Sequence, residues 1–165
     1  MLQKKICMLG AFAVGKTSLV QRFVKSLFSE KYQTTVGVRI DKKVVTLGDE
    51  SVNLLLWDIQ GEDELQKLRL SYLRGASGYL LVVDGTRAGT VTTALALQEA
   101  AAGEMGQVPF VCIVNKADLT EEWEVGPEEM ARLKSRGWNV LTSSAKTGEG
   151  VEEAFLDLTR RMLQG

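Results

Sequence analysis

The segment from Gly10 to Thr17 constrains this chain more than any other part of its sequence. It reads Gly-Ala-Phe-Ala-Val-Gly-Lys-Thr, which is the phosphate-binding pattern Gly-x-x-x-x-Gly-Lys-Thr. The apolar run Ile6–Leu9 directly precedes it, and Ser18–Val24, whose apolar residues recur at helical spacing, directly follows. A glycine-rich loop between a buried strand and a helix is the setting in which this pattern binds phosphate.

The residue types in this loop suit a bound phosphate group. Its glycines allow backbone N–H groups to turn inward around an anion. The helix behind it adds unsatisfied N–H groups and the positive end of its dipole. Lys16 supplies a charge for the β- and γ-phosphates of a nucleotide, and Thr17 supplies a hydroxyl for Mg²⁺. The segment therefore predicts a site for a Mg²⁺-bound nucleotide.

Strands and helices are expected to alternate along the chain. Apolar and β-branched runs predict strands at Ile6–Leu9, Val38–Leu47, Val52–Trp57, Tyr79–Val83, Val108–Val114 and Trp138–Leu141. Helices are predicted at Ser18–Val24, Thr90–Met105, Pro127–Ser135 and Val151–Leu163. A turn at Gly48-Asp49-Glu50 joins two strands as a hairpin. We expect a single domain over residues 1–165 with an α/β fold: a six-stranded, mostly parallel sheet with one antiparallel edge strand and helices on both faces.

The composition excludes several classes of function. The chain has 20 basic and 21 acidic residues and no long basic run, so no nucleic-acid partner is expected. It contains no histidine, which excludes a histidine general base and argues against zinc. Cys7 and Cys112 lie in apolar runs and are expected to be reduced and buried. Because no stretch approaches the ~20 apolar residues that span a bilayer, we expect a cytoplasmic monomer with no direct membrane anchor in this chain.

Polar residues follow the predicted strand Val52–Trp57. The carboxylate of Asp58 at a strand tip can hold Mg²⁺ or one of its waters. Gly61, three residues further on, permits close approach of the backbone to a terminal phosphate. Ligands of parallel sheets bind beyond the carboxyl ends of the strands, so this loop is expected to lie beside the phosphate-binding loop.

Two later loops carry groups suited to a guanine base. Asn115-Lys116-Ala117-Asp118 follows the strand Val108–Val114. The carboxylate of Asp118 can accept hydrogen bonds from both N1–H and the exocyclic amine of guanine, a donor pair that adenine lacks. Such a site rejects a base without the matching groups by up to ~10⁴–10⁵. Ser144-Ala145-Lys146, after the last predicted strand, would offer a backbone N–H to guanine O6.

These motifs together resemble the Ras superfamily of small GTPases across essentially the whole chain. The matching segments are Gly10–Thr17, Thr35, Asp58–Gly61, Asn115–Asp118 and Ser144–Lys146, in the family's order and spacing. The segments Trp57-Asp58 and Thr35-Val36-Gly37-Val38 look most like the Rab branch, or the Rab-like GTPases of bacteria and archaea. The resemblance implies a P-loop NTPase G domain that binds GTP or GDP with Mg²⁺ and hydrolyses GTP.

The resemblance also implies a role for each matching residue. Thr17 and Thr35 would ligate Mg²⁺ directly, and Asp58 would do so through water. The other nucleotide contacts would be Gly10, Ala13, Val14, Gly15, Lys16, Ser18, Phe28, Tyr32, Gly61, Asn115, Lys116, Asp118, Leu119, Ser144, Ala145 and Lys146. Among them, Phe28 would pack edge-on against guanine and Lys116 would lie along it. Catalysis would involve Lys16, Thr35, Gly61 and Glu62.

Three departures from the family pattern cluster where the γ-phosphate is expected. Glu62 stands where the family has a glutamine that orients water; a carboxylate repels phosphate oxygens, or it serves as a base for the water. Gln60 replaces an alanine, and it either crowds the turn or substitutes for the missing amide. Phe12 replaces a small residue in the phosphate-binding loop, where its ring either obstructs an arginine from a partner protein or points outward and packs on the second switch, residues about 59–73.

The sequence therefore predicts a GTP/GDP switch with slow, atypical hydrolysis. Protein effectors and regulators would bind through residues about 29–45 and 59–73, including the mixed charge run Arg39–Lys43. A GTP-bound docking module without turnover is a second hypothesis. A P-loop kinase for a small acceptor is a third, although the chain leaves little room for a lid and an arginine-rich acceptor pocket.

Overall fold

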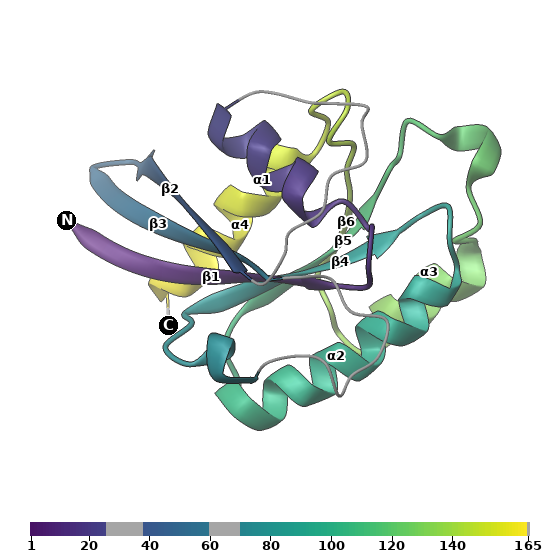
Figure 1. Cartoon of the computed structure of the whole chain (residues 1–165), viewed down its shortest axis with the longest axis horizontal. Helices are drawn as coiled ribbons and strands as arrows, with labels where there is room; N and C mark the ends of the chain where they lie inside the picture. Colours follow the sequence, from purple (N-terminus) through teal and green to yellow (C-terminus); the bar gives the residue numbers. More distant parts are fainter. Residues whose placement is uncertain (26–37, 60–69, 165) are drawn as a thin grey trace.

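A central sheet forms the middle layer of the computed structural model, which describes residues 1–25, 38–59 and 70–164 (Figure 1). In the described residues the sheet has six strands in the order β2-β3-β1-β4-β5-β6. Their bounds are β1 (Leu2–Gly10), β2 (Val38–Leu47), β3 (Glu50–Ile59), β4 (Gly78–Asp84), β5 (Phe110–Asn115) and β6 (Val140–Thr142). β2 and β3 pair antiparallel, and every other neighbouring pair is parallel. The predicted sheet, with its single antiparallel edge strand, is confirmed.

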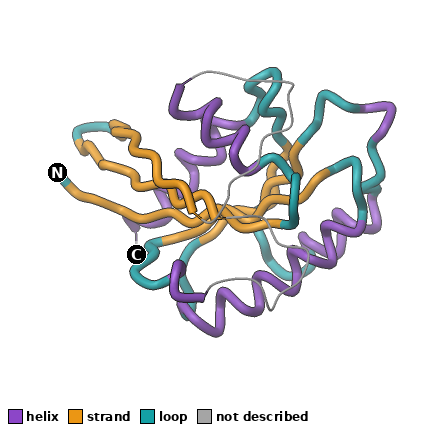
Figure 2. Tube along the Cα trace, in the orientation of Figure 1, coloured by secondary structure: helices purple, strands orange, loops and turns teal. Residues whose placement is uncertain are grey.

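Helices cover both faces of this sheet, as predicted. They are α1 (Lys16–Lys25), α2 (Gly89–Met105), α3 (Pro127–Lys134) and α4 (Val151–Gln164), with short 3₁₀ turns η2 (Leu70–Leu73) and η3 (Thr120–Glu122). α1 and α4 lie on one face, and α2 and α3 lie on the other (Figure 1; Figure 2 shows the same layers by type of structure). The alternation of strand and helix along the chain produces this three-layer arrangement.

Alternation along the central strands divides the apolar core between the two faces. In β1, Ile6 and Met8 face the layer of α1 and α4, whereas Cys7 and Leu9 face α2 and α3. The rings of Phe23 in α1 and Phe155 in α4 are stacked with their centroids 4.1 Å apart. Because helices cover both faces, β4, β5 and the second half of β1 carry unbroken apolar runs.

Strand ends differ from the prediction where pairing decides them. β3 continues through Asp58 to Ile59, because these residues pair with Arg39 and Val38 of β2. Asp58 therefore lies inside a strand, not in the loop after it. The last strand begins at Val140 instead of Trp138, whose ring packs edge-on against Phe110 at 5.2 Å.

Both cysteines are buried and free, as expected. Burial raises the pKa of Cys7 to about 11 and that of Cys112 to about 12, so both thiols are protonated at neutral pH. Among the described helices, none is both long and apolar enough to cross a membrane.

Candidate nucleotide site

The phosphate-binding loop joins the carboxyl end of β1 to the start of α1. Its shape depends on Gly15, whose φ of 105° is rarely accessible to residues with a side chain. A Cβ atom at Gly15 would also lie 2.3 Å from Nδ2 of Asn115. Glycine satisfies both the torsion and the close approach, so the backbone conformation and the contact with Asn115 at the end of β5 explain the second glycine of the motif.

Lys16 opens α1 and turns its ammonium group back over the loop. The residue is only 6% exposed, and Nζ donates to the carbonyls of Gly10 at 3.3 Å and Ala11 at 3.4 Å. An ammonium group with so little access to water is strongly attracted to an anion that enters the loop. The position therefore suits the phosphate-binding role that the sequence predicts.

Thr17 and Asp58 come together between α1 and β3. The Thr17 hydroxyl donates to Oδ2 of Asp58 at 2.6 Å, and Asp58 is 1% exposed. Hydroxyl and carboxylate oxygens are the hard donors that Mg²⁺ prefers, and Mg²⁺ usually keeps several waters and binds phosphate as well. The described residues contain no group of three or more His, Cys, Asp or Glu, so a cage built only from such side chains is absent there. This pair fits a cation whose shell is completed by water and phosphate.

The two loops expected to recognise the base are bonded to each other. Ser144 Oγ donates to Oδ1 of Asp118 at 2.7 Å and accepts a hydrogen bond from the backbone N–H of Thr147 at 3.1 Å. The carboxylate of Asp118 is thus oriented by a serine from a loop 26 positions away. A carboxylate held in one orientation can present its oxygens to a pair of donors on a purine.

Asn115 ties the base loops to the phosphate-binding loop. Its Nδ2 donates to the carbonyl of Val14 at 3.1 Å, and its Oδ1 accepts from Ser143 Oγ at 3.0 Å. The residue is 2% exposed. The described site residues, spread over more than 130 positions in the sequence, therefore converge at the carboxyl end of the sheet.

Arg22 is a contributor that the sequence did not reveal. It lies in α1, and its Nε donates to the carbonyl of Ala145 at 2.7 Å, while Nη2 bonds the carbonyl of Lys146. These bonds fix the backbone of the loop Ser144–Lys146, which is predicted to contact the base, through a side chain 123 positions earlier in the sequence. An arginine in a helix reads in sequence as a solvated residue, so no local signal identifies this contact.

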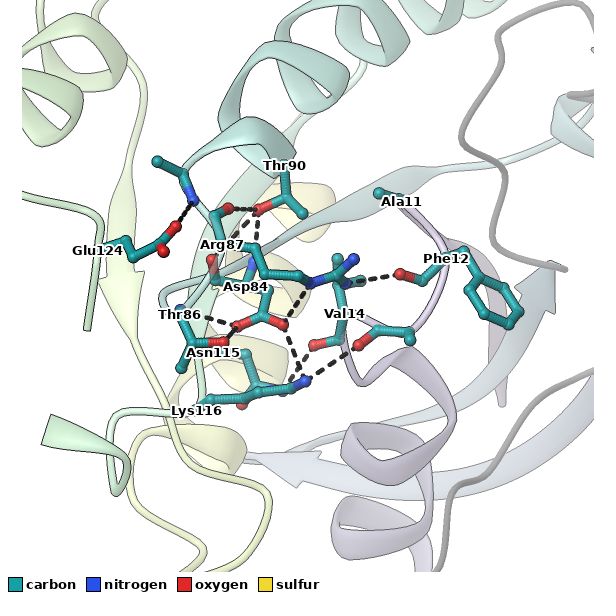
Figure 3. A network of polar contacts seen from close by, with 12 residues as sticks. Ala11, Phe12, Val14, Asp84, Thr86, Arg87, Thr90, Asn115, Lys116 and Glu124 are labelled. Carbon is teal, nitrogen blue, oxygen red and sulfur yellow. Dashed lines mark hydrogen bonds and ion pairs between the residues drawn. The ribbon is translucent and has the colours of Figure 1, made fainter. Parts of the chain in front are cut away.

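Asp84 at the end of β4 is a second unpredicted feature (Figure 3). Its Oδ1 accepts from the backbone N–H and the hydroxyl of Thr86, and its Oδ2 lies 3.0 Å from Arg87 Nε and 2.8 Å from Lys116 Nζ. Burial by itself would raise the pKa of Asp84, but the hydrogen bonds from Lys116, Thr86 and Arg87 lower it below the ordinary value. The sequence did carry a signal, because Asp84 directly follows the predicted strand Tyr79–Val83, as Asp58 directly follows the predicted strand Val52–Trp57.

The remaining predicted residues fall into two groups. Ser18 lies in the first turn of α1, and the backbone N–H of Leu119 donates to the carbonyl of Lys116 at 2.9 Å. Phe28, Tyr32, Thr35, Gln60, Gly61 and Glu62 lie outside the described residues.

The side chain of Phe12 points away from the polar network around Asp84 (Figure 3), and the residue is 39% exposed. This outward direction agrees with the first part of the second interpretation; packing on the second switch stays a prediction, because residues 60–69 lie outside the described residues.

Comparison with known proteins gives one consistent answer. The sequence profile of the Ras family matches residues 5–164. The chain is 35% identical over 163 residues to Ras-related protein Rab-4 of Dictyostelium discoideum, covering 96% of this chain and 78% of that one. It is 35% identical over 161 residues to human Ras-related protein Rab-4B, covering 96% and 76%. Rice (Oryza sativa subsp. japonica) Ras-related protein Rab5A is 34% identical over 163 residues, covering 98% and 80%.

Proposed function

This chain belongs to the Ras family of small GTP-binding switch proteins, and we propose that residues 1–165 form one domain that binds GTP with Mg²⁺ and hydrolyses it slowly. The observation that carries the proposal is the convergence of Lys16, the Thr17–Asp58 pair and the Asp118–Ser144 pair at one end of the sheet. Lys16 would bind the phosphates, the Thr17–Asp58 pair would bind the cation, and the Asp118–Ser144 pair would bind the base.

The phosphate end of the proposed site belongs to the loop and the start of α1. Backbone N–H groups of residues 13–18 and the ammonium of Lys16 would hold the β- and γ-phosphates. Thr17 would bind the cation directly and Asp58 through water, with Thr35 as a further ligand. When bound, Mg²⁺ would neutralise charge on the phosphate oxygens.

The base end of the proposed site would select guanine. Asp118, oriented by Ser144, would accept from N1–H and the exocyclic amine. The backbone N–H of Ala145 would donate to O6, in a loop whose carbonyls Arg22 holds in place. Asn115 retains one Nδ2 hydrogen and one Oδ1 lone pair beyond its two loop contacts, which allows a further bond to the base.

Partners would bind the edge of the sheet next to the nucleotide. We propose that effectors and regulators use residues about 29–45 and 59–73. In the described part of this surface, Ile40 and Val44 of β2 are 47% and 53% exposed, which gives the edge strand apolar contact points between its charged residues.

The direct test is the identity of the nucleotide in the purified protein. We expect guanine nucleotide at close to one molecule per chain, released by EDTA and separated by ion-exchange chromatography. Equal affinity for ATP and GTP would instead support the kinase alternative and contradict the role of Asp118.

Glu62→Gln is expected to accelerate hydrolysis. The wild-type rate should stay below about 10⁻² s⁻¹, because an ionised glutamate repels phosphate oxygens and cannot donate to them. Glutamine restores a hydrogen-bond donor and removes the negative charge, so we expect the hydrolysis rate to rise about tenfold. This increase is smaller than the ~10²–10³-fold rate effect of one fully oriented donor. Single-turnover release of phosphate from preloaded GTP measures this rate.

The matched control is Glu153→Gln, an exposed carboxylate on α4, which should leave the rate unchanged. A slower Glu62→Gln variant would identify Glu62 as the base for the attacking water, and an equal rate would remove it from catalysis. Absence of turnover in the wild-type protein would support the docking module that binds GTP without hydrolysing it.

A further inference from the structure

Three successive carbonyl groups of the phosphate-binding loop are held from outside the loop. The carbonyl of Phe12 accepts from Arg87 Nη2 at 2.6 Å, that of Ala13 from Lys116 Nζ at 3.1 Å and that of Val14 from Asn115 Nδ2 at 3.1 Å. Figure 3 shows the three donors arriving from the same side. Carbonyls drawn outward leave the neighbouring N–H groups free to point inward, toward a phosphate.

The phosphate-binding loop and the loop after β5 each contain a residue in an unfavourable backbone conformation. Ala13 has a φ of 62° and Lys116 a φ of 73°, and these are the only non-glycine residues with positive φ in the described part of the chain. This left-handed region is unfavourable for residues with a side chain. Nζ of Lys116 donates to the carbonyl of Ala13, so the two residues with unfavourable torsions are joined by a hydrogen bond. This contact between the two loops helps to stabilise the backbone of each.

Arg87 bridges a fixed anchor and the loop. Its Nε contacts Oδ2 of Asp84 at 3.0 Å, while Nη2 of the same planar guanidinium bonds the Phe12 carbonyl. Asp84 is 1% exposed and also binds Lys116. One buried carboxylate therefore organises the cations that hold two adjacent loop carbonyls.

The segment that carries Arg87 is itself packed firmly. Glu124 Oε1 accepts from the backbone N–H of Ala88 at 2.9 Å, and the carbonyl of Gly85 accepts from the backbone N–H of Glu124 at 2.7 Å. A Cβ atom at Gly85 would lie 2.0 Å from the ring of Trp123, so only glycine permits this packing. The base of the arginine side chain is thus fixed relative to the sheet.

We propose that Arg87 is a positioning residue that locks the phosphate-binding loop in its phosphate-holding shape and thereby slows release of bound nucleotide. The inference rests on the proposed function, because it concerns the nucleotide of that site. Arg87 acts from the outer side of the loop, with Nε on Asp84 and Nη2 on a carbonyl, and it therefore holds the loop without contacting the phosphate.

Arg87→Ala should release GDP about tenfold faster, the effect expected for loss of a hydrogen bond from a charged group. Release is measured with fluorescently labelled GDP chased by excess unlabelled GDP in the presence of Mg²⁺. Arg87→Lys should be intermediate, because an ammonium lacks the planar fork that reaches both partners at once. The control is Arg161→Ala, which should leave release unchanged: Arg161 also pairs with an aspartate, at 3.2 Å, but lies in the last turn of α4.

Comparing GDP with GMP separates positioning from general destabilisation. In the proposed site the loop would surround the β-phosphate, which GMP lacks, so Arg87→Ala should weaken GDP binding about tenfold and leave GMP binding nearly unchanged. Equal losses for both ligands, or GDP release at the wild-type rate, would overturn the inference while leaving the proposed function intact. Slower hydrolysis with unchanged release would also overturn it. If the wild-type protein bound no guanine nucleotide, the proposed function would fail first.

Discussion

Asp118→Asn is expected to lower the affinity for GTP by about 10²–10⁴, because two hydrogen bonds to a charged acceptor are each worth about 1.5–3 kcal/mol. The carboxylate is oriented by Ser144 at 2.7 Å, so the substituted amide would enter the same position. Its NH₂ group would then face a donor of guanine and leave it unpaired. Isothermal titration with GTP, after removal of bound nucleotide, measures the loss.

The same variant should gain affinity for xanthosine triphosphate. Xanthine carries a carbonyl where guanine carries the exocyclic amine, and it keeps N1–H. An asparagine can donate to that carbonyl and accept from N1–H, whereas Asp118 of the wild-type protein would face the carbonyl with a second acceptor. Retained binding of the xanthine nucleotide also shows that the variant is folded. Unchanged preference for GTP would contradict the assignment of Asp118 to the base.

The parts of the fold that the sequence predicts are those controlled by burial. β4, β5 and the second half of β1 are buried on both faces, so their apolar runs identify them directly. The first half of β1, Leu2–Lys5, is more exposed and carries no such run, and the predicted strand begins only at Ile6. The ends of β3 and β6 are less predictable, because they depend on which residues of another strand complete the pairing. Asp58 illustrates the difference: local sequence places it in a loop, and pairing with Arg39 places it in a strand.

The residues of the candidate site also divide into some that the sequence predicts and some that it does not. Residues that follow parallel strands, such as Lys116 and Asp118, could be predicted because strand ends converge at one edge of the sheet. Arg22 and Arg87 could not, because they act on carbonyl groups 123 and 75 positions away. Nothing in the local spacing of Arg22 in α1, or of Arg87 in the loop between β4 and α2, distinguishes such a contact from a solvated side chain. The backbone proposed to recognise the nucleotide is thus positioned by residues that belong to none of the sequence motifs.

Lys16→Ala is expected to weaken GTP binding by about 10²–10³, since loss of one partner of a buried charge pair costs about 2–5 kcal/mol. Lys16 is 6% exposed and its Nζ already lies over the loop, 3.3 Å from the carbonyl of Gly10, so little rearrangement is needed to meet a phosphate. Lys25, exposed at the other end of α1, supplies the matched control through Lys25→Ala. Titration with GTP, GDP and GMP measures the effect.

The dependence on phosphate number identifies where Lys16 acts. An ammonium that contacts the β- and γ-phosphates contributes most to GTP, less to GDP and least to GMP, so the loss in Lys16→Ala should fall in that order. Ligand binding stabilises the folded state in proportion to RT ln(1 + [L]/Kd), so GTP should raise the melting temperature of the wild-type protein and of Lys25→Ala far more than that of Lys16→Ala. An equal loss for all three nucleotides would place Lys16 away from the terminal phosphates and would contradict the site proposed here.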